Sequence, residues 1–216
     1  MKVLRGSILS NSALIASFLA SASLLFFGFN ITGCSRTPNT VGTPSPHATA
    51  TPRSGRAGIW ILVDSQTEQL TLYQDGRPEL VFDNVAFGAA GVGKKSERGD
   101  DKTPKGVFTI GWINRESKYV HFIGLNYPGV ADAKSGLERG IIDRKAYDRI
   151  NRAHASGLTP PQDTALGGMI GIHGVGRGSI EIHRVANWTA GCVAVDNQQI
   201  RRLTDKVQLG MVVEIR

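Results

Sequence analysis

From residue 57 to the end of the chain, apolar residues fall mostly in short runs that have the length and composition of β-strands. Residues 59–63 are uniformly apolar, which predicts a buried strand. Residues 69–73 alternate polar and apolar positions, which predicts a strand with one face in water. The Asp75-Gly76 pair is a strong hairpin signal, so the chain is expected to return as a strand over 80–87.

Further apolar runs predict strands later in the chain, at 107–112, 119–125, 169–173, 192–195 and 211–215. The stretch 88–106 is different, because it is rich in Gly, Lys and Asp. It predicts a long loop, and long loops inside compact domains are often functional.

Helical spacing of apolar residues is clear in only one segment, 142–156, where Asp143 is placed to cap the start. A second helix is expected over about 197–207, capped by Asp196 or Asn197. Strands therefore dominate, and the predicted fold class is mainly β with some α.

The first 33 residues have the layout of a secretory signal peptide. Lys2 and Arg5 precede a largely apolar run over 8–29, and the segment ends at Gly33, just before Cys34. The alternative is an uncleaved transmembrane anchor, because the run is long enough to span a bilayer. The ending resembles the lipobox of bacterial lipoproteins. That resemblance implies cleavage after residue 33 and a diacylated Cys34. It also implies a lipid-anchored domain at the periplasmic face, in the outer membrane if the cell has two membranes.

Residues 34–56 are rich in Thr, Pro and Ser and contain almost no large apolar side chain. Such a segment cannot bury enough surface to offset the entropy of ordering it. It predicts a disordered tether between the lipid and one folded domain at 57–216.

The net charge of +7 sits mostly outside that domain. Residues 1–56 contain five basic residues and no acidic one, whereas residues 57–216 contain 20 basic and 18 acidic residues. A nearly neutral domain without a basic run is poorly suited to the phosphate backbone, so nucleic acid is not the expected partner.

Lipidation of Cys34 would leave Cys192 as the only free thiol, in an oxidising compartment. Secreted proteins usually pair their cysteines, so a single remaining one is a candidate reactive group. The alternative is a buried structural residue, since free Cys packs well in protein interiors.

The neighbours of Cys192 favour chemistry. His173 ends the preceding predicted strand, and a Gly-rich loop over 174–178 follows it, a topology that can bring the imidazole to the thiol. An imidazole can take the thiol proton, so we expect a thiolate–imidazolium pair. Gly191 permits a tight turn, and the amides of Gly191 and Cys192 are candidate oxyanion-hole donors.

The pattern from His173-Gly174 to Thr189-Ala190-Gly191-Cys192-Val193 resembles the signature of the YkuD-type L,D-transpeptidases. The first hairpin, the Thr103-Pro104-Lys105-Gly106 loop and Leu125-Asn126-Tyr127-Pro128 are also similar to that family, so the resemblance covers nearly all of 58–216. It implies a β-sandwich-like catalytic domain that needs no cofactor and acts on peptidoglycan.

The resemblance also implies roles. Cys192 would attack the L,D bond of a tetrapeptide stem at its meso-diaminopimelate and release the terminal D-Ala, with His173 as the base. An amine from a neighbouring stem or a wall-linked protein would then resolve the thioester. Backbone amides of Gly191 and Ala190 would hold the oxyanion. Further candidate pocket residues are Thr189, Gly174 and His183, the last of which is equally compatible with an ordinary strand residue.

Two positions depart from the commonest family pattern. Ala190 stands where His is usual, and Ala194 stands where Arg or Asn is frequent. The pair of Cys192 and His173 is intact, so these departures bear on the acceptor and on transfer versus hydrolysis.

Three alternatives remain open from sequence. Water in place of the amine would make the enzyme a hydrolase of stems or of wall-linked lipoprotein, acting as an L,D-carboxypeptidase or endopeptidase. His173, His183 and Cys192 could instead bind zinc, although their spacing matches no compact zinc motif. A non-catalytic wall-binding lipoprotein would not need the thiol at all.

Overall fold

The structure is a computed structural model that describes residues 57–216, and the predicted signal peptide, tether and Cys34 lie outside them. Its strands are β1 (Ile59–Asp64), β2 (Gln69–Gln74), β3 (Arg77–Phe82), β4 (Val92–Gly93), β5 (Thr103–Pro104), β6 (Gly106–Ser117), β7 (Val120–Leu125), β8 (Gly171–His173), β9 (Val193–Ala194) and β10 (Val212–Ile215). Its helices are α1 (Val130–Glu138), α2 (Arg144–Ala155), α3 (Ile180–Val185) and α4 (Asn197–Thr204). The predicted class, mainly β with some α, is confirmed.

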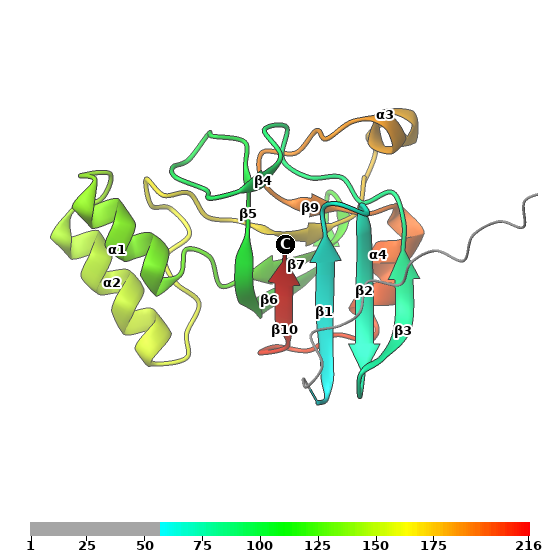
Figure 1. The fold of residues 1–216 in the computed structure, drawn as a ribbon, viewed down its shortest axis with the longest axis horizontal. Helices are drawn as coiled ribbons and strands as arrows, with labels where there is room; N and C mark the ends of the chain where they lie inside the picture. The colour runs from blue at the N-terminus through cyan, green and yellow to red at the C-terminus, as the bar shows by residue number, and fades with distance from the viewer. Residues whose placement is uncertain (1–56) are drawn as a thin grey trace, which may run out of the picture. The chain divides into compact units, whose positions relative to one another are not determined.

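Eight strands form one sheet in the order β3-β2-β1-β10-β6-β7-β8-β9, and β4 pairs with β5 separately. The last strand, β10, runs parallel to β1 and antiparallel to β6. The first residues of β6 pair with β10 and its later residues pair with β7. In Figure 1, β1, β2, β3 and β10 stand side by side, whereas β8 and β9 run across behind them. The long strand β6 therefore joins two differently oriented halves of the sheet.

The main apolar core is built by the period-two alternation of strand side chains. Ile61 and Val63 of β1 face this core, whereas Trp60 faces the opposite side of the strand. There Trp60 stacks on Tyr73 of β2, with 4.8 Å between ring centroids. This contact buries Tyr73, so the predicted wet face of β2 is wrong at this position.

Several element boundaries differ from the prediction because tertiary pairing sets them. β3 ends at Phe82 rather than at residue 87, since the chain leaves β2 and Ala86 bridges to Ala194 instead. β6 continues to Ser117, well beyond the predicted end at residue 112. The short helices α1 and α3 are absent from the prediction, because α3 has only six residues and gives almost no periodic signal.

The predicted helix at 142–156 is confirmed as α2, and the Asp143 carboxylate accepts a hydrogen bond from the Ala146 amide at 2.7 Å. α1 and α2 pack on each other around a small second core that includes Ile150 and Leu166. This helix pair stands to one side of the sheet in Figure 1. Among the described residues, no helix combines the length and apolarity needed to cross a membrane.

Candidate active site

The two residues predicted to react are placed by neighbouring strands. His173 is the last residue of β8, and Cys192 immediately precedes β9. The two strands are parallel, with Ile172 opposite Val193 and His173 opposite Ala194. His173 and Cys192 are therefore carried by neighbouring strands, with His173 at the end of β8 and Cys192 just before the start of β9.

Both side chains line one open pocket of about 520 Å³. Thr189 and Ala190 also line it, as predicted for Thr189. Much of the remaining wall is aromatic and comes from Trp112, Tyr119, Phe122 and Trp188. A pocket of this size, mainly apolar with a few polar groups, is typical of a small-molecule or peptide site.

The orientation of His173 leaves its basic nitrogen available. Its Nδ1 lies 2.7 Å from the carbonyl oxygen of Gly174. A carbonyl oxygen only accepts, so Nδ1 carries the hydrogen and Nε2 is the unprotonated nitrogen of the neutral ring. Tyr119 stacks on the imidazole at 4.2 Å between centroids. Gly174 does not line the pocket, and its contribution is the carbonyl that fixes the ring of His173.

The electrostatics of the resting site favour a neutral pair. Burial lowers the pKa of His173, the bond to Gly174 opposes that shift, and electrostatic interactions with His183 and Lys118 add to it. Burial raises the pKa of the Cys192 thiol to about 11, against smaller opposing effects of the Gly171 backbone and Lys95. The expected thiolate–imidazolium pair is therefore not favoured at rest.

The thiol itself is held by the backbone of the preceding segment. Cys192 Sγ donates to the carbonyl oxygen of Met169 at 3.3 Å. Met169 adopts a positive φ of 55° just before β8, which is uncommon for a residue with a side chain. The resting thiol hydrogen thus points to a backbone acceptor rather than to a base.

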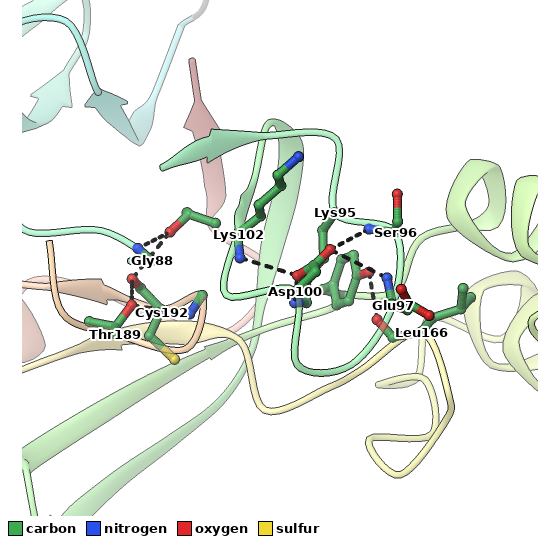
Figure 2. A network of polar contacts seen from close by, with 12 residues as sticks. Gly88, Lys95, Ser96, Glu97, Asp100, Lys102, Leu166, Thr189 and Cys192 are labelled. Carbon is green, nitrogen blue, oxygen red and sulfur yellow. Dashed lines mark hydrogen bonds and ion pairs between the residues drawn. The ribbon is translucent and has the colours of Figure 1, made fainter. Parts of the chain in front are cut away.

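Two threonine hydroxyls donate hydrogen bonds to the backbone of Cys192. The hydroxyl of Thr189 donates to the Cys192 carbonyl oxygen at 2.7 Å, and that of Thr103 donates to the same oxygen at 3.3 Å. The Thr103 hydroxyl also accepts from the Gly88 amide at 2.8 Å. Figure 2 shows Gly88 and Thr189 beside Cys192 in this network. The backbone of Cys192 is therefore positioned by residues far apart in the sequence.

The predicted oxyanion hole needs a correction at Gly191. Its amide donates to the hydroxyl of Thr189 at 3.1 Å and is not free for a substrate. The amides of Ala190 and Cys192 have no hydrogen-bond acceptor within residues 57–216 and remain available. Gly191 is required for the turn instead, because its φ is +126° and a Cβ there would lie 2.6 Å from the Lys102 carbonyl oxygen.

The loop predicted at 88–106 is held by a buried ion pair. Lys95, 5% exposed, pairs with Asp100. The Asp100 carboxylate also accepts from the amides of Ser96 at 2.7 Å and Lys102 at 3.1 Å. Figure 2 shows this cluster on the same loop that passes Gly88. The ion pair therefore shapes the loop whose backbone packs against Gly191.

His183 lies in α3 and does not line the pocket that contains Cys192, so both alternatives predicted for it, a residue of that pocket or a strand residue, are wrong. Its Nδ1 accepts a hydrogen bond from the indole Nε1 of Trp188 at 3.3 Å. Trp188 in turn lies edge-on to His173, with 5.8 Å between centroids. No cluster of three or more metal-binding side chains occurs in the described part of the chain. Trp188 therefore separates His183 from the pocket that contains Cys192. The zinc alternative, which needs His173, His183 and Cys192 as a cluster of ligands, is not supported by their positions.

Sequence reasoning missed several residues that shape the site: Thr103, Lys95, Lys118, Tyr119 and Trp188. Only the Thr103-Pro104 motif carried a signal, since it was already part of the family resemblance. The others become visible only when the chain is folded.

The family model of the L,D-transpeptidase catalytic domain, YkuD, matches residues 58–215. No curated protein matches the chain. Solved structures that do match include the helical cell shape determining protein Pgp2 from Campylobacter jejuni, with 22% identity and a TM-score of 0.48 over 74% of this chain and 47% of that one.

Two more solved structures have similar statistics. Bd1075 from Bdellovibrio bacteriovorus is 20% identical, with a TM-score of 0.46 over 74% of this chain and 48% of its own. An L,D-transpeptidase from Xylanimonas cellulosilytica is 17% identical, with a TM-score of 0.42 over 77% and 63%. This chain spans about half the length of the first structures that it matches.

Proposed function

Because the chain belongs to the YkuD family of L,D-transpeptidase catalytic domains, we propose that it is a cysteine acyltransferase that remodels peptidoglycan through tetrapeptide stems. The observation that carries this proposal is the geometry of one pair. Cys192 and His173 line the same open pocket, and the bond from His173 Nδ1 to Gly174 leaves Nε2 free to accept a proton.

In the first half-reaction, the sulfur of Cys192 attacks the carbonyl carbon of the L,D bond while His173 Nε2 takes the thiol proton. The negative charge that forms on the carbonyl oxygen is stabilised by backbone N–H groups, for which the free amides of Ala190 and Cys192 are the candidates. The carbon–nitrogen bond then breaks. The leaving D-Ala amine receives the proton from His173, and the stem remains on sulfur as a thioester.

In the second half-reaction, an amine attacks the thioester carbonyl and His173 takes one of its protons. The carbon–sulfur bond breaks, a new amide forms, and the proton returns to Cys192. The acceptor is an amine of a neighbouring stem or of a wall-linked protein. Each step needs a neutral His173 at its start, and the lowered pKa of His173 supplies that form at neutral pH.

The test is mass spectrometry of the full chain after incubation with disaccharide-tetrapeptide muropeptide, alongside the Cys192→Ala variant. We expect a cross-linked dimer with the intact thiol only, and a trapped thioester on the peptide that contains Cys192. Dimer formation by the Cys192→Ala variant would refute the role of the thiol. A wall-binding protein without activity would leave the muropeptide unchanged with either variant.

Hydrolysis is the second candidate, and one observation favours it. Among the side chains that line the pocket, none is acidic, so the pocket offers no carboxylate to a protonated acceptor amine. Water needs no such partner. A tripeptide product without dimer would identify an L,D-carboxypeptidase, whereas release of a wall-linked protein would identify an endopeptidase.

We further propose that the chain is exported and anchored at the periplasmic face by lipid on Cys34. The proposal is supported by the N-terminal pattern of 1–34 alone. Metabolic labelling with a palmitate analogue, compared between the natural chain and Cys34→Ala, is the measurement. Equal labelling of the two chains would count against lipid on Cys34.

A further inference from the structure

The pocket has one formally charged side chain. Of the residues that line it, only Lys118 is charged near neutral pH, since burial keeps His173 neutral. The other lining residues are aromatic, apolar or uncharged polar. A mainly apolar pocket whose lining includes a single cationic side chain is expected to prefer anionic ligands.

The ammonium group of Lys118 lies on the same wall as the proposed base. Its Nζ is 5.0 Å from the centroid of the Tyr119 ring, in a cation–π contact. Tyr119 stacks on His173 at 4.2 Å. Lys118, Tyr119 and His173 thus follow one another along the pocket, and the charge of Lys118 acts on His173.

Lys118 is also free to take an anionic ligand. It forms no ion pair with any carboxylate in residues 57–216, and its side chain is exposed. The exposed Glu116 nearby on the same hairpin leaves it unpaired. A ligand carboxylate would therefore not have to displace a resident partner.

The backbone that presents Lys118 is fixed. Lys118 stands in the turn between β6 and β7, where the Tyr119 amide donates to the Ser117 hydroxyl at 3.1 Å. The Gly174 amide donates to the Tyr119 carbonyl oxygen at 3.1 Å, which ties this turn to the residue that orients His173. At Gly176 a Cβ would lie 2.4 Å from the Lys118 carbonyl oxygen, so the loop after β8 packs closely on the turn.

We propose that Lys118 forms a carboxylate-binding subsite that holds the acyl donor beside Cys192. The inference rests on the proposed function in its identification of the donor as a stem peptide. Two carboxylates flank the L,D bond of such a stem, one on the terminal D-Ala and one on the side chain of diaminopimelate. Both have the chemistry that a single ammonium recognises.

The first experiment needs no stem peptide. Cys192 of the full chain is alkylated with iodoacetate, which is anionic, or with iodoacetamide, which is neutral, and peptide mass spectrometry follows each rate. We expect Lys118→Gln to lower the iodoacetate-to-iodoacetamide rate ratio about fivefold, the scale of one partly exposed ion pair. Any change in the basicity of His173 affects both reagents and cancels in the ratio.

Two matched variants control this measurement. Lys118→Arg keeps the charge and is expected to keep the ratio near the natural value. Lys145→Gln removes an exposed lysine from α2, outside the pocket lining, and is expected to change nothing. An unchanged ratio in Lys118→Gln, or an equal fall in Lys145→Gln, would overturn the subsite.

The second experiment assigns the carboxylate. Turnover is compared for the tetrapeptide stem, the stem with a C-terminal amide, and the stem amidated on the diaminopimelate side chain. Lys118→Gln should raise KM about fivefold for each stem that keeps the recognised carboxylate and leave KM nearly unchanged for the stem that lacks it. An equal loss on all three stems overturns the subsite and leaves the transpeptidase proposal standing. A charge-dependent alkylation without turnover of any stem supports the subsite and refutes the proposed function.

Discussion

Cys192 lies between two walls of the site that differ in the kinds of residue that form them. The back wall, with Thr103, Thr189 and the Lys95–Asp100 pair, is dense in hydrogen bonds and holds backbone. The front wall, with His173 and Tyr119, is aromatic and has few hydrogen bonds. The comparison teaches that two tasks fall to different walls: the back wall holds the backbone of Cys192, whereas in the proposed mechanism the front wall supplies the group that takes the thiol proton.

The largest expected effect comes from the front wall. His173→Gln removes the base while its amide group can still donate to the Gly174 carbonyl. The rate of thioester formation at neutral pH should fall by about 10²- to 10⁴-fold, the usual contribution of a general base. Stopped-flow measurement of acylation, with a thermal melt beside it, tests whether rate is lost without unfolding. A rate loss below tenfold would mean that the thiol is activated by something other than His173.

Substitutions in the back wall should instead lower the free energy of unfolding. Asp100→Asn leaves the buried ammonium of Lys95 without its counter-ion, which is expected to lower the free energy of unfolding by about 3–5 kcal/mol. Asp205→Asn is the matched control, because Asp205 is 71% exposed in its ion pair with Arg115 and should change stability far less. Chemical denaturation of both variants provides the comparison. Equal losses would show that the Lys95–Asp100 pair does not hold the loop.

A smaller effect is expected at Thr189, where the two walls touch. Thr189→Val removes the hydroxyl that accepts from Gly191 and donates to the Cys192 carbonyl. We expect a loss of about 1–3 kcal/mol in unfolding free energy and a lower kcat, because buried polar groups lose their partner. Thr189→Ser keeps the hydroxyl and should recover most of both quantities. Failure of the serine variant to recover kcat would point to a packing role for the methyl group.

The smallest effect is a dependence of stability on pH. Because burial lowers the pKa of His173 below its ordinary value of 6.5, the folded state binds fewer protons than the unfolded chain just below that pH. Stability is therefore full above about pH 6.5 and declines as the pH falls below it. His173→Gln should flatten this decline only in part, since burial also lowers the pKa of His183. Denaturation curves from pH 5 to 8 would contradict this if both proteins showed the same slope.

The sequence predicts the parts of this molecule that local patterns encode. Continuous apolar runs predicted β1 and β8, and the Asp143 cap marked the start of α2. The placement of His173 and Cys192 beside two short strands was expected from the order of the apolar runs. Such features depend on residues close together in the chain, so they leave a local signature.

For most residues of the back wall and many of the front wall, the neighbouring sequence has no pattern that predicts their contacts. Thr103 reaches Cys192 across 89 residues, and no local pattern encodes that contact. Lys95 reads as a surface residue of a polar loop until the fold buries it beside Asp100. His183 was misplaced because a six-residue helix gives too few positions to show a period. Gly191 was identified correctly as a turn residue, whereas the use of its amide depends on the rotamer of Thr189.

The strand β6 has a consequence for how this fold can diversify. Its first residues are locked in register with β10 at the centre of the domain, whereas its far end forms the hairpin tip that carries Lys118. Insertions, deletions or exchanges at the tip leave the central register intact, because they occur beyond the last residue that β10 pairs. Under the proposed carboxylate-binding subsite, exchanges at the hairpin tip should change donor selectivity and leave the centre of the sheet intact. For the proposed activity, the hairpin tip is therefore the segment to vary in a selection for altered donors.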